Sequence, residues 1–121
     1  MKDELTERII GAAIEVHRLL GPGLLEAIYE EALCVELQER GIKYEQQAEI
    51  DVKYKGRIIK GQRIDLIVAG EVIVGLKALA DVPDFATAQV LSYLKATGLK
   101  RALLINFSAP RLIDGVKRFS L

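Results

Sequence analysis

Tryptophan is absent from this 121-residue sequence, and cysteine occurs once, at Cys34. The chain therefore cannot form an intramolecular disulfide, and we expect Cys34 to be a small, buried apolar residue. Only 6% of the residues are aromatic, so Leu, Ile and Val must build most of any hydrophobic core. Half of the residues are hydrophobic, which is typical of a globular protein and argues against disorder.

Long apolar runs are also missing. Residues 1–8 are charged and contain no hydrophobic stretch of the kind found in signal peptides. No apolar segment approaches the roughly 20 residues that a membrane-spanning helix requires. These absences predict a cytoplasmic protein with no membrane association.

The chain has no excess of charge of either sign. Its 17 basic residues balance 17 acidic residues, and the formal net charge is zero. The molecule as a whole therefore has no field that would attract nucleic acid. A local basic groove is still compatible with this composition, because the distribution of charge matters more than its sum.

Apolar residues recur at helical spacing in three segments. Residues 4–20 and 24–40 each show an apolar stripe, and the Gly-Pro-Gly sequence at 21–23 separates them. A third helix is predicted for residues 85–97, where Gly98 provides a stop signal.

Four segments are predicted to be strands. Residues 44–54 alternate between two faces, which indicates a half-exposed strand near a sheet edge. Residues 57–69 follow after a hairpin turn, and residues 72–79 are almost wholly apolar, as in a central strand. Residues 101–106 follow the third helix and should join the same sheet by a crossover. A further short strand is expected in the tail, residues 108–121.

The predicted order is helix, helix, three strands, helix, strand. Three strands in an antiparallel meander, followed by a crossover, predict an α/β (α+β) fold with a mixed sheet of four to five strands flanked by helices. The length fits a single domain that spans residues 1–121.

Asp65 is the strongest candidate for a functional residue. It lies inside a strand that is otherwise largely apolar, where a carboxylate is costly unless it is paired or bound to a metal. A salt bridge to Arg63 or to another basic residue would explain it structurally. Lys77 on the next strand favours a functional role instead, because a lysine beside acids can position water and stabilise charge on a phosphate.

Other candidates are weaker when taken alone. Glu26 and Tyr29 share a face of the second helix, but the helix dipole is sufficient to explain Glu26. Gln89 and Tyr93 share a face of the third helix, where Tyr93 reads as a core aromatic residue. The only histidine, His17, has no second ligand at metal-binding spacing and is expected to be a surface or capping residue.

Residues 23–29, Gly-Leu-Leu-Glu-Ala-Ile-Tyr, match the full signature of the GxxExxY family. The later motifs follow the family's order too: Arg-Ile-Asp at 63–65, the strand at 72–77, and Gln89 and Tyr93 in the helix. The resemblance covers nearly the whole chain. The family is similar to a compact branch of the PD-(D/E)xK nuclease superfamily, and Gln89-x-x-x-Tyr93 resembles the QxxxY motif of its RecB-type members.

This resemblance implies a PD-(D/E)xK nuclease-like fold and metal-dependent hydrolysis of phosphodiester bonds, with Mg²⁺ or Mn²⁺ as the cofactor and nucleic acid as the partner. It implies that Glu26 and Asp65 are acids of the metal site and that Lys77 is the catalytic lysine. Gln89 and Tyr93 would support that site.

The chain departs from the family pattern at Gly75. The pattern there is Glu-Leu-Lys, whereas this chain has Gly-Leu-Lys. Mg²⁺ prefers oxygen ligands in strict octahedral geometry, so the loss of a carboxylate should weaken metal binding. Glu71 is near in sequence but lies too far along the strand to substitute.

Two functional hypotheses follow. The chain is either a nuclease whose activity is impaired at Gly75 or a non-catalytic module that binds nucleic acid or protein on the same fold. Whether it is an enzyme, and whether it recognises DNA or RNA, stay open at the level of sequence. Pairing of two chains into a homodimer through the first helix is a further hypothesis, which light scattering can test.

Overall fold

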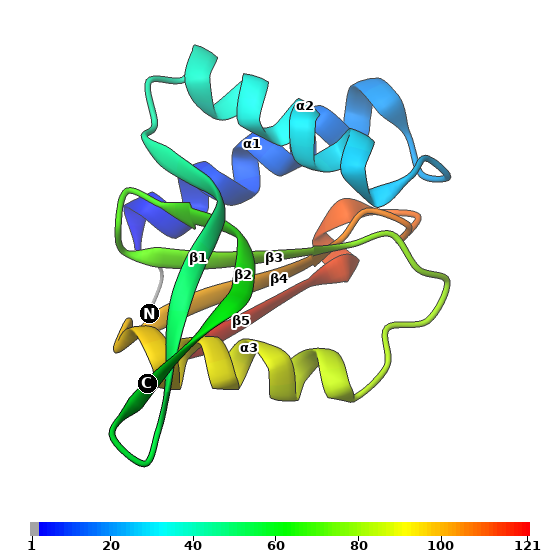
Figure 1. Ribbon diagram of the computed structural model, residues 1–121. Helices are drawn as coiled ribbons and strands as arrows, with labels where there is room; N and C mark the ends of the chain where they lie inside the picture. Colours follow the sequence, from blue (N-terminus) through cyan, green and yellow to red (C-terminus); the bar gives the residue numbers. More distant parts are fainter. Residues whose placement is uncertain (1–2) are drawn as a thin grey trace.

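The computed structural model describes residues 3–121 and shows a five-stranded sheet with helices on both faces (Figure 1). In chain order the elements are α1 (Glu4–Leu20), α2 (Glu26–Glu39), β1 (Tyr44–Tyr54), β2 (Arg57–Val68), β3 (Val72–Lys77), α3 (Phe85–Thr97), β4 (Arg101–Asn106), the 3-10 helix η1 (Leu112–Gly115) and β5 (Val116–Ser120). α1 and α2 cover one face of the sheet, and α3 covers the other. Within the described residues, no helix is long and apolar enough to span a membrane.

The strands lie side by side in chain order, from β1 at one edge to β5 at the other. β3 and β4 are parallel, because α3 carries the chain back along the sheet between them, and the other neighbouring pairs are antiparallel. The predicted mixed sheet, the edge position of β1 and the central position of β3 are confirmed. β5 is the short last strand expected in the tail.

Several predicted boundaries lie one or two residues outside the observed ones, and side-chain hydrogen bonds explain the two largest differences. α2 begins two residues later than predicted, since the backbone N–H of Leu24 binds the Tyr29 hydroxyl at 3.0 Å outside the helix. β3 ends at Lys77 rather than at residue 79, since the Asn106 side chain binds both the N–H and the carbonyl of Leu79. Asn106 thereby fixes the chain just beyond Lys77.

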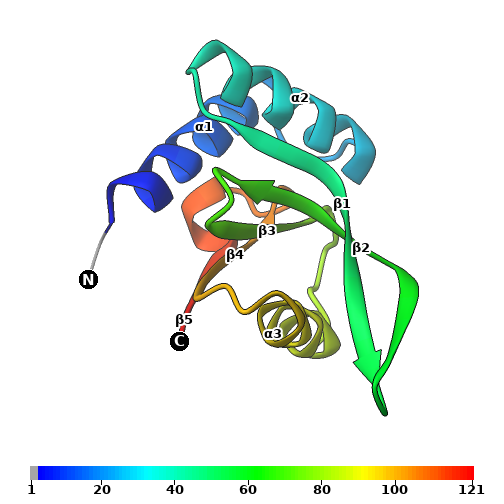
Figure 2. The same cartoon turned by 60° about the vertical axis from the view of Figure 1, so that its left-hand side comes forward.

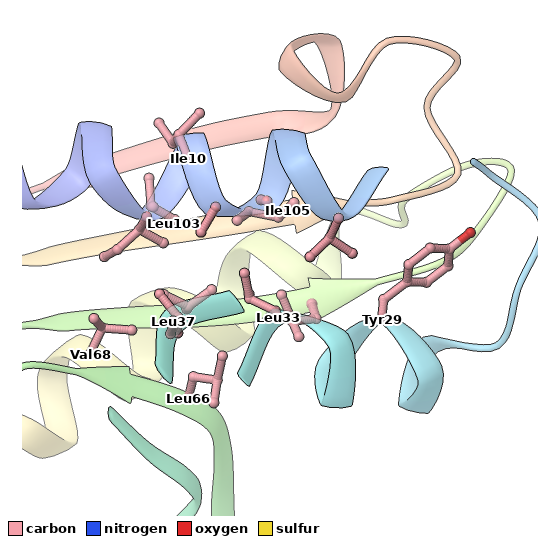
Figure 3. Close-up of a cluster of buried hydrophobic side chains, with 14 of the residues drawn as sticks. Ile10, Tyr29, Leu33, Leu37, Leu66, Val68, Leu103 and Ile105 are labelled. Atoms are coloured by element: carbon pink, nitrogen blue, oxygen red, sulfur yellow. The ribbon is translucent and has the colours of Figure 1, made fainter. Parts of the chain in front are cut away.

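Aliphatic side chains build the core on both faces of the sheet, as the shortage of aromatic residues predicted. The larger cluster lies between the sheet and the pair α1 and α2 (Figure 3) and includes Ile10, Leu33, Leu37, Leu66, Val68, Leu103 and Ile105. The smaller cluster lies under α3 and includes Ile64, Ile73, Val90, Leu94 and Leu104. The sheet is therefore buried on both faces in its central part.

The single cysteine and the single histidine both make contacts that support the fold. Cys34 is 4% exposed in the larger core, and burial raises the pKa of its thiol to about 11. The thiol therefore stays protonated at neutral pH, in agreement with its predicted role as a small apolar residue. The Nε2 atom of His17 lies 2.9 Å from the Ala109 carbonyl oxygen, so the ring ties α1 to the segment after β4.

Tyr29 anchors the loop between α1 and α2. Its ring is fully buried and stacks on Phe107, with 4.6 Å between the ring centroids and 4° between the planes. Its hydroxyl donates a hydrogen bond to the Gly21 carbonyl oxygen at 2.5 Å and accepts one from the Leu24 N–H. The ring and hydroxyl together fix the position from which α2 starts.

β1 and β2 continue past the sheet as a hairpin that projects beyond α3 (Figure 2). Residues 51–62, which we call the arm, are exposed throughout. Lys55 and Gly56 form its turn with φ values of 50° and 76°. Two successive positive φ angles are typical of the type I′ turn, whose twist matches that of paired strands.

Removal of the buried hydroxyl in Tyr29→Phe should lower the free energy of unfolding by about 1 kcal/mol or more, because two backbone groups lose their partner. Urea denaturation measures the change. Tyr54→Phe is the matched control: Tyr54 is 59% exposed, so the same change there should stay within about 0.5 kcal/mol. Equal effects of the two substitutions would show that the hydroxyl of Tyr29 does not hold the loop.

Candidate functional site

Asp65, the strongest candidate from the sequence, lies in β2 next to β3, the strand that carries Gly75 and Lys77. The antiparallel pairing of Leu66 with Val74, continued by one residue, places Asp65 opposite Gly75. Oδ2 of Asp65 accepts a hydrogen bond from the backbone N–H of Leu76 at 2.8 Å. This bond holds the carboxylate against β3, beside the position that lacks a side chain.

The surroundings of Asp65 disfavour its ionised form. Burial raises the pKa of Asp65, and the negative charge of Glu30 adds to the rise. The hydrogen bond from Leu76 and the positive charge of Lys77 act in the opposite direction. The net rise means that the carboxylate lacks full compensation for its burial.

Arg63 does not provide that compensation. Its guanidinium donates to the Gln47 carbonyl oxygen at 3.1 Å and lies 3.7 Å from the carboxylate of Glu49. A salt bridge between Arg63 and Asp65, one of the structural explanations available from the sequence, is therefore wrong. The two residues are two positions apart on β2, but their side chains bind different partners.

Glu26, the first residue of α2, interacts electrostatically with the same group of residues. Burial raises the pKa of Glu26, the charges of Asp65 and Glu30 raise it further, and the charge of Lys77 lowers it. Glu26, Asp65 and Lys77 come from α2, β2 and β3, so the fold brings together three residues that are far apart in sequence. We call these three residues the acid–lysine cluster.

Glu30 and Gln47 belong to this neighbourhood although the sequence did not single them out. Glu30 is 9% exposed, and its carboxylate accepts hydrogen bonds from the side chains of Gln46 at 2.8 Å and Gln47 at 2.9 Å. The same amide nitrogen of Gln47 lies 3.5 Å from Oδ1 of Asp65. Glu30 follows Glu26 by four residues, and this helical spacing was the signal that could have found it.

Gln47 meets Asp65 because the pairing of β1 with β2 shifts at the base of the arm. If the register at the turn continued, Gln47 would lie opposite Ile64. One extra residue in β2, beside Gly61 with φ of 112°, shifts the pairing so that Ala48 lies opposite Ile64 and Gln47 lies opposite Asp65. Gln47 itself has φ of 50°, an uncommon value for a residue with a side chain.

Tyr93 connects α3 to the same neighbourhood. Its hydroxyl accepts a hydrogen bond from the side-chain amide of Gln62 at 3.2 Å. Burial raises the pKa of Tyr93 and the charge of Asp65 adds to the rise, whereas hydrogen bonds from Gln62 and Gln89 lower it. Gln89 and Tyr93 also line a groove of about 790 Å³ between α3 and the base of the arm.

The sequence as a whole was compared with known proteins. The family model of the PD-(D/E)XK nuclease superfamily matches residues 3–119. The chain belongs to this superfamily. No curated protein and no solved structure matched it. The nuclease superfamily generally uses divalent metal ions, so the acids around Asp65 can be compared with what such a site needs.

Gly75 stands where the family resemblance described above expects an acid, and the structure leaves space for a side chain there. A Cβ atom at this position would lie 3.4 Å from Cδ1 of Leu104 and 3.8 Å from Cγ2 of Val90, which are ordinary van der Waals contacts. Gly75 does not have a positive φ, so its backbone does not require glycine. The missing carboxylate is therefore not excluded by steric constraint at its first atom.

The acids present do not complete a metal site of the nuclease superfamily. Within residues 3–121, no three His, Cys, Asp or Glu side chains are grouped closely enough to hold a metal ion. Glu26 and Asp65 offer two carboxylates, and the carboxylate of Glu30 is occupied by two glutamine amides. The family resemblance described above expects a further carboxylate at the position of Gly75.

Asp65→Asn should stabilise the folded chain more at neutral pH than at about pH 4. The folded chain holds the Asp65 proton to higher pH than the unfolded chain, so ionisation makes folding less favourable as the pH rises through the raised value. Asparagine never ionises and can still accept the Leu76 N–H. Urea denaturation at the two pH values measures the difference in the free energy of unfolding.

The control for this comparison is Asp81→Asn, in the exposed loop after β3. This substitution should change stability by a similar amount at both pH values. If Asp65→Asn shows no greater pH dependence than Asp81→Asn, burial does not disfavour the charge of Asp65.

Proposed function

We propose that this chain belongs to the GxxExxY branch of the superfamily and acts on phosphodiester bonds of nucleic acid at the acid–lysine cluster. Its hydrolysis is slow, because Gly75 leaves the metal site one carboxylate short. The observation that carries the proposal is the convergence of Glu26, Asp65 and Lys77 beside the vacant position on β3.

The residues of the cluster have distinct roles in this proposal. Glu26 and Asp65 would hold Mg²⁺ or Mn²⁺, and the bound ion would supply electrostatic activation of water and phosphate. The ammonium group of Lys77 stabilises negative charge on the phosphate.

Gln89 and Tyr93 support this site in the proposal from the side of α3. Tyr93 responds to the charge of Asp65 and is held by Gln62, so its hydroxyl lies at the boundary between the cluster and the groove. A phosphate that reaches Asp65 from the groove would pass these side chains. Polar groups there can orient it by hydrogen bonds.

One observation favours a second candidate function. Since no metal-holding group of three acids exists within residues 3–121, the chain is also suited to binding nucleic acid without cleaving it. In that case the fold has kept the surface of a nuclease but not its chemistry. The two functions predict different results when glutamate replaces Gly75. Cleavage should return if the chain is an impaired nuclease, and it should not return if the chain only binds nucleic acid.

Gly75→Glu should raise metal-dependent cleavage of nucleic acid by about a hundredfold, since misplacing a reacting group by about 1 Å has an effect of that size. Release of labelled fragments from single-stranded and duplex DNA and RNA, with Mg²⁺ or Mn²⁺, measures the rate. The double variant Gly75→Glu, Lys77→Ala should lose the gained activity.

Gly75→Gln is the matched control, because glutamine has the length of glutamate but no charge. It should leave cleavage at the level of the unmodified chain. Equal rates for the unmodified chain and Gly75→Glu would refute impairment at Gly75. Folded Gly75→Glu protein that binds nucleic acid but does not cleave it would favour the non-catalytic function.

A further inference from the structure

The arm concentrates positive charge on a chain whose net charge is zero. It carries four basic residues, Lys53, Lys55, Arg57 and Lys60, and one acidic residue, Asp51. The rest of the chain is therefore net acidic, since basic and acidic residues number 17 each overall. All residues of the arm are exposed, and the arm projects from the molecule (Figure 2).

The cations nearest the tip of the arm are exposed, and the ammonium of Lys55 lies 5.5 Å from the centre of the Tyr54 ring. Lys60 pairs with Asp51, and Arg63, just beyond the arm, lies 3.7 Å from Glu49. Within residues 3–121, the ion pairs on this hairpin involve these two cations and leave Lys53, Lys55 and Arg57 out. Three exposed cations that have no carboxylate partner are suited to bind an external polyanion.

The groove between the arm and α3 is lined by apolar, polar and charged side chains. Its acidic lining residue, Asp51, is paired with Lys60. Its apolar lining includes Ile50, Val52, Phe85, Ala88 and Ala96. Lys53 on the arm and Lys95 on α3 stand on its two sides, and Phe85 is 63% exposed. Such a surface offers an aromatic ring and aliphatic side chains to flat bases and ammonium groups to phosphates.

We propose that this groove and the arm bind single-stranded nucleic acid, with bases against Phe85 and phosphates at Lys53, Lys55 and Arg57. The inference rests on the proposed function, because it names the substrate class of the acid–lysine cluster. A duplex presents phosphates and sugars on its outside and keeps its bases stacked inside. The apolar part of the lining therefore suits unpaired bases better than a duplex.

The position of the groove relative to Asp65 connects binding with the cluster. Tyr93 lines the groove, and its hydroxyl responds to the charge of Asp65. Gln62, at the base of the arm, lines the groove too and binds that hydroxyl. A strand held by the arm therefore leads along these two side chains toward Asp65.

The test measures binding of fluorescein-labelled oligothymidine, oligouridine and a DNA duplex by fluorescence anisotropy, in EDTA so that no cleavage occurs. The unmodified chain should bind the single strands more tightly than the duplex. The arm variant Lys53→Gln, Lys55→Gln, Arg57→Gln should bind single strands about tenfold more weakly. The slope of log affinity against log salt should fall by about 2, since each lost phosphate contact changes it by about 0.7.

A second triple variant, Lys43→Gln, Lys100→Gln, Arg111→Gln, removes the same charges away from the arm and should bind nearly as the unmodified chain does. Phe85→Ala should weaken single-strand binding about fivefold, through loss of stacking. Leu91→Ala, an exposed position on α3 outside the groove lining, is its control and should have little effect.

Binding by the arm variant that equals that of the unmodified chain would overturn the inference, and so would tighter binding of the duplex or no binding of single strands. These outcomes are separate from the failure of the proposed function. If Gly75→Glu protein cleaves through the acid–lysine cluster but the arm variant binds normally, the proposed hydrolysis is supported and binding by the arm is refuted. If the arm variant loses binding but Gly75→Glu protein does not cleave, binding by the arm is supported and the proposed hydrolysis is refuted.

Discussion

The one-residue shift in the pairing of β1 and β2 is the constraint on which the rest of the site depends. Because side chains alternate between the faces of a sheet, a shift of one residue exchanges the partners along the whole strand. Here it places Gln47 opposite Asp65, and the amide of Gln47 then joins that acid to Glu30 on α2. The same irregularity marks the start of the arm. The one-residue shift therefore determines both which residues surround Asp65 and where the arm begins.

The electrostatics of the neighbourhood explain why a gap at Gly75 is tolerated. Glu26 and Asp65 both have raised pKa values, from burial first and from neighbouring acids second, and Lys77 offsets only part of this. A further carboxylate on β3 would add like-charge repulsion in the absence of a cation. In the proposed site, the glycine would therefore remove a cost to folding together with a metal ligand. Stability and activity commonly oppose each other in this way at functional sites.

Much of the fold was predictable because it depends on local patterns. Helical and strand periodicities identified the elements and the crossover, but they placed several ends one or two residues too far out, as at Leu79, where the Asn106 side chain binds the backbone. The site was less predictable. Tyr29 shares a helix face with Glu26 in the sequence, but its ring lies fully in the core and its hydroxyl holds the preceding loop. Glu30 and Gln47 carried only weak signals, because their importance comes from contacts between elements.

By itself, the sequence determined the order of the elements, the aliphatic core, the acid and lysine on adjacent strands, and the glycine that interrupts the motif. Each of these follows from residue type and spacing along one chain. Only the tertiary structure decided that Glu30 and Gln47 adjoin Asp65, that Arg63 binds other partners, and that the basic residues of the arm project together from the molecule. The physical reason is that spacing sets the direction of a side chain within its own element. Which residues meet across elements depends on strand register and packing.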